Sequence, residues 1–240
     1  MKISLVIPAF NEERLLGATL ERINAARVVF GAAAWDSELI VCDNNSTDRT
    51  AEIARDGGAL VVHEPVNQID RARNRGAAAA TGDWLLFIDA DSLPSPELFT
   101  DLVAAIRGGR CLAGGSTVCI EAGPAARLIS GSWNLLSRAR RWMAGSFIFC
   151  EAAVFRRIGG FSTELYACEE IDLSLRLRPV ARELGREIVI LHRHPLHTSE
   201  RKVHLYSARE HVWFLLRLVL RPRAILRSRE ACHIWYDGRR

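Results

Sequence analysis

Trp84-Leu85-Leu86-Phe87-Ile88-Asp89-Ala90-Asp91 joins five apolar residues directly to a pair of carboxylates. An uninterrupted apolar run of this length is typical of a strand buried on both faces of a parallel sheet. Because alternate residues leaving a strand point to the same side, we expect Asp89 and Asp91 to converge on one hard cation, Mg²⁺ or Mn²⁺. The alternative is a hydrated turn after the strand, since an Asp-x-Asp pair alone is a frequent chance match.

Strand-like and helix-like segments alternate upstream of this run. Short apolar runs alternate with longer stretches whose apolar residues recur at helical spacing. We predict strands at 3–8, 38–42, 59–63 and 84–88, and helices at 12–27, 47–55 and 69–80. This alternation indicates βαβ units and a mostly parallel sheet, hence an α/β fold whose ligands bind at the carboxyl ends of the strands.

The pattern is looser after Asp91. We expect helices at 96–107, 125–142 and 206–220, strands at 111–120 and 188–192, and an extended segment at 145–155. The chain has no internal repeat and no low-complexity linker. We therefore expect one domain over 1–204, with halves 1–91 and 92–204, followed by a basic helical tail over 205–240.

The composition excludes a disordered chain, because 49% of the 240 residues are hydrophobic. The net charge of +4 is unevenly distributed. Residues 176–240 hold 15 Arg or Lys against 6 Asp or Glu, a charge of +9, which leaves 17 against 22, or −5, for the other residues. Such an uneven distribution of charge along a chain usually indicates binding to a charged partner. A nucleic-acid partner is not expected, because no recognisable binding motif accompanies the basic residues.

The six cysteines form no Cys-x-x-Cys pair and no zinc pattern, so we expect buried free thiols in a reducing cytoplasm. The amino-terminal residues enter a strand-like run without the shape of a signal peptide. The longest late apolar run, 212–220, is interrupted by Arg217 and is shorter than the roughly 20 residues of a bilayer span. These features predict a cytoplasmic protein, at most peripheral at the inner face of the membrane.

Polar residues gather at the predicted carboxyl ends of three strands. The segments are Pro8-Ala9-Phe10-Asn11-Glu12, Asp43-Asn44-Asn45-Ser46 and Asp89-Ala90-Asp91. Each alone is more often a turn or helix cap than a ligand, but three on one binding edge favour a site. In the helix at 69–80, Arg71 and Arg75 are four residues apart and share a face, so this basic face is either simply exposed to solvent or part of a ligand-binding helix. Arg73 and Asn74 are expected to reach toward a ligand beside Asp89 and Asp91.

Four segments together resemble the family 2 glycosyltransferases of the GT-A fold. They are Pro8-Ala9-Phe10-Asn11-Glu12-Glu13, Val41-Cys42-Asp43-Asn44-Asn45-Ser46-Thr47-Asp48, Ala72-Arg73-Asn74-Arg75-Gly76 and Phe87-Ile88-Asp89-Ala90-Asp91. The resemblance covers about residues 1–200 and implies a Rossmann-like three-layer α/β/α fold with a mostly parallel central sheet, plus the basic C-terminal helical tail. It implies a nucleotide-binding half at 1–91 and an acceptor half at 92–204.

The resemblance implies roles for residues of the first half. The nucleotide would lie against these residues: Pro8, Ala9, Phe10, Glu12, Asp43, Asn45, Arg73, Asn74 and Asp89. Asp43 would accept a hydrogen bond from the base, usually uracil. Asp89 and Asp91 would hold Mg²⁺ or Mn²⁺ and the diphosphate, with Asp91 the stronger metal ligand and Asp89 nearer the ribose or sugar.

The second half resembles the acceptor side of the family. Gly159-Gly160-Phe161, Glu169-Glu170-Ile171-Asp172-Leu173 and Arg176 are similar to the segment GGF…ED-x-DL-x-x-R, whose Asp after the first Glu is the general base. This chain has Glu170 there, so a carboxylate one methylene longer would take the acceptor's proton. Glu169 or Asp172 is the substitute, and the alternative is an acidic helix N-terminus that complements the helix dipole. Gly145 and Ser146 resemble an acceptor-facing glycine segment, or form an ordinary turn.

Basic and histidine residues follow. His192, His194 and His197 are expected in a loop, where one His completes the metal or diphosphate site; no matching cluster favours zinc. Arg201 and Lys202 would neutralise the leaving diphosphate, or are solvated. In the tail, an aromatic-rich apolar helix beside arginines suits an anionic membrane surface, a homodimer interface or a plain core helix.

These features predict a metal-dependent glycosyltransferase, which moves a sugar from a nucleoside-diphosphate donor, a UDP-sugar, to a hydroxyl acceptor with inversion. The acceptor could be a saccharide, a lipid-linked molecule or a small molecule. A nucleotidyltransferase would need a Gly-rich phosphate loop after the first strand, and a P-loop kinase would need GxxxxGK[ST]; neither pattern is present. A catalytically silent nucleotide-sugar-binding protein is the alternative that the Glu170 substitution supports.

Overall fold

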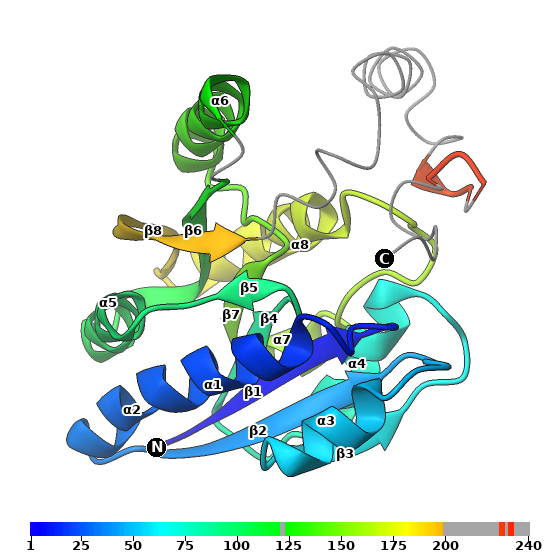
Figure 1. The fold of residues 1–240 in the computed structure, drawn as a ribbon. Coiled ribbons are helices and arrows are strands. Elements are labelled where there is room, and N and C mark those ends of the chain that lie inside the picture. Colours follow the sequence, from blue (N-terminus) through cyan, green and yellow to red (C-terminus); the bar gives the residue numbers. More distant parts are fainter. Residues whose placement is uncertain (121–122, 199–225, 229, 233–240) are drawn as a thin grey trace.

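A single mixed sheet organises the chain in a computed structural model, which describes residues 1–120, 123–198, 226–228 and 230–232 (Figure 1). Within these residues the sheet has eight strands in the order β3-β2-β1-β4-β7-β6-β8-β5. The strands are β1 (Lys2–Ala9), β2 (Asp36–Asp43), β3 (Leu60–His63), β4 (Trp84–Ile88), β5 (Ser92–Leu93), β6 (Cys111–Cys119), β7 (Phe147–Glu151) and β8 (Glu187–Thr198).

The first four strands are parallel, as predicted. β1 lies between β2 and β4, and β3 pairs with β2. The register sets Ala9 beside Asp43 and Asp43 beside His63, so three strands end level at one edge. β7 then runs antiparallel to both β4 and β6, whereas β8 runs parallel to β6 and antiparallel to β5. The expected α/β fold with a mostly parallel sheet is confirmed.

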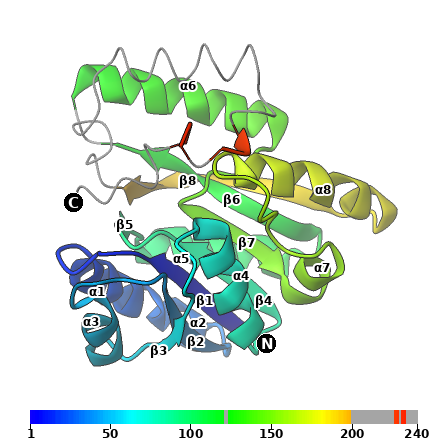
Figure 2. The same ribbon diagram turned by 90° about the vertical axis from the view of Figure 1, so that its right-hand side faces the viewer.

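Helices cover both faces of the sheet and give it three layers (Figures 1 and 2). One apolar core includes residues of α1, α2, α3 and α5, and a second includes residues of α4, α7 and α8. The helices are α1 (Leu16–Ala26), α2 (Val28–Ala32), α3 (Thr50–Asp56), α4 (Ile69–Ala79), α5 (Pro96–Arg107), α6 (Pro124–Arg140), α7 (Ala152–Arg157) and α8 (Glu169–Glu183).

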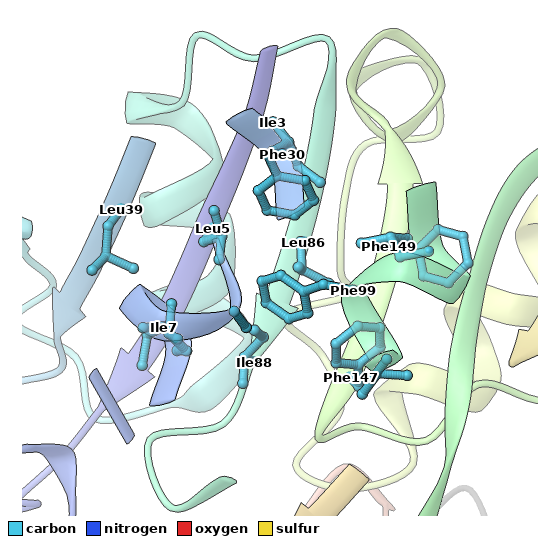
Figure 3. Close-up of a cluster of buried hydrophobic side chains, with 14 of the residues drawn as sticks. Ile3, Leu5, Ile7, Phe30, Leu39, Leu86, Ile88, Phe99, Phe147 and Phe149 are labelled. Carbon is cyan, nitrogen blue, oxygen red and sulfur yellow. The ribbon is translucent and has the colours of Figure 1, made fainter. Parts of the chain in front are cut away.

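Strand alternation divides the apolar side chains between the two cores. Ile3, Leu5 and Ile7 of β1 belong to the first core, and Val6 belongs to the second. Figure 3 shows Phe30 and Phe99 over the sheet in the first core, where their ring centroids are 5.1 Å apart. Since both faces are covered by helices, the strands can be apolar at every position, which is the pattern that made them recognisable.

Several segments differ from the prediction. The helix expected at 12–27 begins at Leu16, and the separate helix α2 was not predicted. The segment expected to be extended at 145–155 is a strand only over β7, and α7 follows immediately. β8 continues to Thr198 because it pairs with both β6 and β5. The helix expected at 206–220 lies outside the described residues.

The contact between α4 and β1 leaves no room for a side chain at Gly76. A Cβ there would lie 2.4 Å from Val6 Cγ1, far inside van der Waals contact. We predict that Gly76→Ala lowers the free energy of unfolding by about 1–3 kcal/mol through overpacking. Chemical denaturation measures this value. Gly31→Ala is the matched control, because a Cβ at this helical glycine meets nothing within 4 Å; a loss of stability there equal to that of Gly76→Ala would contradict the steric explanation.

Candidate active site

The buried guanidinium of Arg73 joins three separate segments at the edge of the sheet. From α4, Nη2 donates to Asp89 Oδ1 at 2.9 Å and to the Gly145 carbonyl at 2.8 Å, and Nη1 donates to Glu169 Oε1 at 2.7 Å. Its Cζ lies 5.2 Å from the centroid of the Phe161 ring. Arg73 therefore connects the end of β4, the turn before β7 and the start of α8.

Arg73 remains charged in this position. Its side chain is only 1% exposed, and burial by itself lowers the pKa of a guanidinium. Here Asp89 and Glu169 outweigh burial and raise the pKa of Arg73 above its ordinary value. A buried arginine is tolerated when carboxylates pair with it in this way. Arg73 thus lies beside Asp89, as predicted. Its side chain is buried, however, and links Asp89 to Glu169 inside the protein.

Of the three predicted acids at the start of α8, Glu169 and Asp172 have cation partners. Glu169 pairs with Arg73, and Asp172 pairs with Arg176 at 2.7 Å, one helical turn later. Arg176 also donates to the carbonyl of Ile158 at 3.0 Å. Asp172 therefore has a local structural role.

Glu170 faces the turn at Gly145. A Cβ built on Gly145 would lie 3.9 Å from Glu170 Oε2 and 3.5 Å from Arg73 Nη2. Burial, and then the charge of Glu169, raise the pKa of Glu170 to about 8. Among the described residues no cation forms an ion pair with its carboxylate. A carboxyl with this pKa, placed beside an open glycine, has the properties of a general base that titrates near neutral pH.

Asp70 is a buried carboxyl that the sequence did not reveal. It lies in the first turn of α4 and is 0% exposed, and no described residue forms a hydrogen bond with either of its oxygens. Burial, followed by the charge of Glu169, raises the pKa of Asp70 well above its ordinary value. Burial therefore favours the protonated form of this carboxyl. An Asp at this position of a helix normally complements the dipole in solvent, so nothing in the sequence pattern indicated its burial.

The argument from strand alternation for Asp89 and Asp91 is wrong. β4 ends at Ile88, and residues 89–92 form a turn in which the Ser92 N–H donates to the Asp89 carbonyl at 3.1 Å. Strand alternation does not govern a turn. Asp89 contacts Arg73, whereas Asp91 lines a cavity of about 570 Å³ next to α1. The convergence of the two carboxylates on one cation stays a prediction.

His197 lies near this turn, but not in a loop. His192, His194 and His197 all belong to β8, because that strand extends to Thr198 along β6 and β5. The register sets His197 beside Leu93, and His197 lines the same cavity as Asp91. His194 Nδ1 lies 3.0 Å from Asp101 Oδ2. Arg201 and Lys202 lie outside the described residues.

The residues predicted for the nucleoside lie at the ends of β1 and β2. Asp43 Oδ1 accepts from the Ser46 N–H at 3.0 Å, and Oδ2 is 3.4 Å from His63 Nδ1. The two loops are joined through Asn11, whose N–H donates to Ser46 Oγ at 3.0 Å. Asn11 and Asn45 have left-handed backbones, with φ of 51° and 65°, a conformation that asparagine tolerates.

The other residues of this group differ in exposure. Pro8, Ala9 and Glu12 are buried, Phe10 is half-buried and Asn45 is exposed. The Glu12 N–H donates to Thr50 Oγ1 at 2.7 Å. The loops are thus held by main-chain and side-chain hydrogen bonds, and Asp43 is placed at their centre.

Asn74 does not reach toward the Asp89 turn. Its Nδ2 donates to the Phe161 carbonyl and its Oδ1 accepts from the Phe161 N–H, both at 2.9 Å. Gln68 Nε2 likewise donates to the carbonyls of Thr163 and Leu165, both at 2.9 Å. These bonds fasten α4 to the segment that precedes α8, so Asn74 positions the Phe161 ring under Arg73.

Ser146 of the predicted acceptor segment lies against the Asp89 turn, because its carbonyl accepts a hydrogen bond from the Asp89 N–H at 3.3 Å.

The described part of the predicted tail contacts the segment that precedes α8. The Tyr166 N–H donates to the Leu226 carbonyl at 2.7 Å, and Arg227 pairs with Glu164 at 2.7 Å. Cys232 is buried, and burial followed by the charge of Glu169 raises its pKa to about 11. All six thiols are free, and four of them are buried, as predicted.

The donor set at the Asp89 turn fits a divalent cation. In the described part of the chain no group of three or more His, Cys, Asp or Glu side chains could enclose a metal ion. Mg²⁺, however, usually takes one or two carboxylates and completes its shell with water and substrate phosphates. Asp89 and Asp91 lie in one turn and are the carboxylates that we predict to form such a pair.

The level strand ends, the acidic turn and the acidic start of α8 lie together at one edge of the sheet and are typical of an α/β protein of the GT-A type. The model of glycosyl transferase family 2 matches residues 4–158, more than half of the chain. The protein belongs to this family.

Curated relatives are similar over shorter segments. Dolichol-phosphate mannosyltransferase of Pyrococcus furiosus is 33% identical over 124 residues, which cover 48% of this chain and 33% of that protein. A PGL/p-HBAD biosynthesis glycosyltransferase of Mycobacterium bovis is 40% identical over 94 residues, 37% of this chain and 34% of that protein. The chain thus spans about a third of the length of these two relatives.

Solved structures show the same fold. TarS 1–349 of S. aureus in complex with UDP-GlcNAc superposes with a TM-score of 0.65 at 19% identity, over 98% of this chain and 69% of that one. Glucosyl-3-phosphoglycerate synthase of Mycobacterium tuberculosis, solved with Mn²⁺, UDP-glucose and phosphoglyceric acid, gives a TM-score of 0.60 at 22% identity, over 97% and 80%. Among the described residues, no helix combines the length and apolarity needed to cross a bilayer.

Asp70 makes stability depend on pH. The pKa of Asp70 is higher in the folded protein than in the unfolded chain, where it is near 4. The unfolded chain therefore releases this proton first, and the folded protein loses stability as pH rises from that value to the raised folded pKa. The groups that act on it are Glu169, Arg73, Glu170 and Asp172. We predict that Asp70→Asn removes this part of the pH dependence, so that the variant gains stability relative to the native chain as pH rises. Denaturation at pH 5, 7 and 9 measures the difference.

Asp56→Asn, at an exposed position, is the control for that series. Its stability should follow the native chain at each pH. An Asp70→Asn variant that is destabilised more at pH 9 than at pH 5 would show that the native carboxylate is ionised and paired.

Proposed function

We propose that the protein is a glycosyltransferase that moves a sugar from a nucleoside-diphosphate donor, a UDP-sugar, to a hydroxyl acceptor with inversion. The observation that carries this proposal is the position of Glu170, which faces Gly145 beside the Arg73–Asp89 pair. Membership of the family supports it. So do the UDP-sugars bound in the complexes of TarS and of glucosyl-3-phosphoglycerate synthase.

The donor would bind along the carboxyl ends of β1, β2 and β4. Asp43, buried at the end of β2, would accept a hydrogen bond from the base, and the β1 loop would line the nucleoside. Asp89 and Asp91 would hold Mg²⁺ or Mn²⁺ together with the diphosphate. When bound, such a cation stabilises the negative charge that develops on the departing diphosphate. Both ions occur in structures of glucosyl-3-phosphoglycerate synthase.

In the transfer, the acceptor hydroxyl would lie between Gly145 and Glu170. Gly145 would let the acceptor approach the main chain closely, because it has no side chain in the space beside Arg73 and Glu170. The acceptor oxygen attacks the anomeric carbon, and its proton passes to the Glu170 carboxylate. The bond from the anomeric carbon to the phosphate oxygen breaks, and the diphosphate leaves with the electron pair. A single displacement of this kind inverts the anomeric centre.

A nucleotide-sugar-binding protein without transferase activity is the second candidate. The observation in its favour is the raised pKa of Glu170, because a carboxyl with a pKa of about 8 is mostly protonated at pH 7 and cannot accept a proton. The two functions differ in their response to pH. A transferase gains activity as Glu170 ionises, whereas a binding protein shows no turnover at any pH.

The pH dependence of turnover should therefore follow the ionisation of Glu170. We predict that kcat/KM for donor hydrolysis or transfer rises with pH through about 8 in the native chain. Glu170→Gln should lower it by about 10²–10⁴-fold, the usual contribution of a general base, and Glu170→Asp should retain part of the activity. Glu169→Gln should shift the profile to lower pH, because the charge of Glu169 raises the pKa of Glu170.

Asp172→Asn is the matched control in the same helical turn, since Asp172 forms only a local ion pair. It should keep kcat/KM within a few-fold of the native value. Loss of activity in Asp172→Asn but not in Glu170→Gln would assign the base to Asp172. Donor binding without turnover in the native chain and in Glu170→Asp, with a range of acceptors, would instead support the binding protein.

Donor binding can be measured without an acceptor. We predict that UDP-sugars with Mn²⁺ or Mg²⁺ raise the melting temperature more than GDP- or dTDP-sugars do. A ligand at 100 times its Kd contributes about 2.7 kcal/mol of stability, which corresponds to several degrees for a chain of this size. Asp91→Asn should lose the part that depends on the cation, and Asp56→Asn should not. If no nucleotide shifts the melting temperature, the donor site is assigned wrongly.

A further inference from the structure

Helix α6 exposes three leucines on one side. Leu128 and Leu135, seven residues or two turns apart, are 73% and 71% exposed, and the neighbouring Leu136 is 40% exposed. Ser130 and Ser137, which also lie two turns apart, are 6% and 0% exposed. A surface helix of a globular protein normally buries its apolar stripe and exposes its polar face. In α6 these three leucines are exposed and these two serines are buried, the reverse of that pattern.

The inner side of α6 is held by polar contacts. Asn134 bonds both main-chain groups of Val118 in β6, with its Oδ1 2.9 Å from the N–H and its Nδ2 2.8 Å from the carbonyl. Ser137 Oγ donates to the Trp142 carbonyl at 2.6 Å. These bonds fix the rotation of the helix, so the exposed leucines are not the result of a helix free to turn. In Figures 1 and 2, α6 lies beside β6, and at its C-terminal end the Arg140 carbonyl accepts a hydrogen bond from Arg178 of α8.

Arginines border the apolar stripe. At about 100° per residue, Arg127 and Arg138 lie on one flank of the leucines and Arg140 lies on the other, and all three are exposed. Residues 124–141 contain four arginines and no Asp or Glu. The fourth, Arg141, pairs with Glu187. An apolar stripe between cationic flanks is the arrangement by which a helix lies in the interface of an anionic membrane.

We propose that α6 binds the surface of an anionic lipid membrane, with Leu128, Leu135 and Leu136 inserted among the acyl chains and the flanking arginines on the headgroups. Charge complementarity favours this occupant over a second copy of the chain. A symmetric dimer through this face would bring the arginines of both copies together with no acidic residue on the helix to balance them. This proposed membrane-binding surface is a second property of the protein and does not depend on the proposed transferase reaction.

The test is co-sedimentation of the full chain with vesicles of phosphatidylcholine alone or with phosphatidylglycerol at about 30%. The native chain should bind the anionic vesicles at least tenfold more strongly than the neutral ones. Leu128→Ser/Leu135→Ser should lower binding to anionic vesicles at least tenfold, since each buried leucine is worth about tenfold or more. Arg127→Gln/Arg138→Gln/Arg140→Gln should lose the preference for anionic lipid, at about fivefold per charge.

Val28→Ser is the matched control, because Val28 is 72% exposed on α2, on another part of the surface; its vesicle binding should equal that of the native chain. Equal binding of the native chain to neutral and anionic vesicles would overturn the proposal. So would a native dimer in analytical ultracentrifugation that Leu128→Ser/Leu135→Ser makes monomeric, without vesicle binding. A large loss of melting temperature in that variant, again without vesicle binding by the native chain, would show that the protein's own chain covers the stripe.

Discussion

The ion pairs of Arg73 are the contacts on which the candidate site depends. One guanidinium holds the end of β4 through Asp89, the start of α8 through Glu169 and the turn before β7 through the Gly145 carbonyl. A guanidinium suits this task because its planar fork donates several hydrogen bonds in fixed directions, which an ammonium group cannot do. Arg73 belongs to α4 and thus to neither segment. It holds the Asp89 turn and the start of α8, which carries the proposed base Glu170, in a fixed arrangement.

The charges around Arg73 do not balance within the described residues. Asp70, Asp89, Glu169 and Glu170 act on a single guanidinium. Burial, and then the charge of Glu169, raise the pKa of Asp70 and of Glu170. Any cation bound near Asp89 would lower the pKa of these groups by simple attraction. Loading of a cation with the donor would then favour the ionised form of Glu170, the form that can accept a proton.

The sequence predicted the parts of this structure that depend on local pattern. The apolar strands buried on both faces, and the polar residues directly after β1, β2 and β4, were visible because strand burial and strand ends leave a periodic signature. Asp70 was not, because a buried acid in a first helical turn has the same sequence pattern as a solvated one. The turn at 89–92 and the length of β8 depend on pairing between distant segments, which no local pattern reports.

The same tertiary context changes what the net charge means. The formal charge of +4 counts Asp70 and Glu170 as anions, yet burial and the charge of Glu169 raise the pKa of both carboxyls. Each of the two that holds a proton makes the net charge one unit more positive. The acidic groups that appear to offset the arginines are thus partly internal. The outer surface, including α6, is more basic than the composition indicates, and this excess is what an anionic surface would attract.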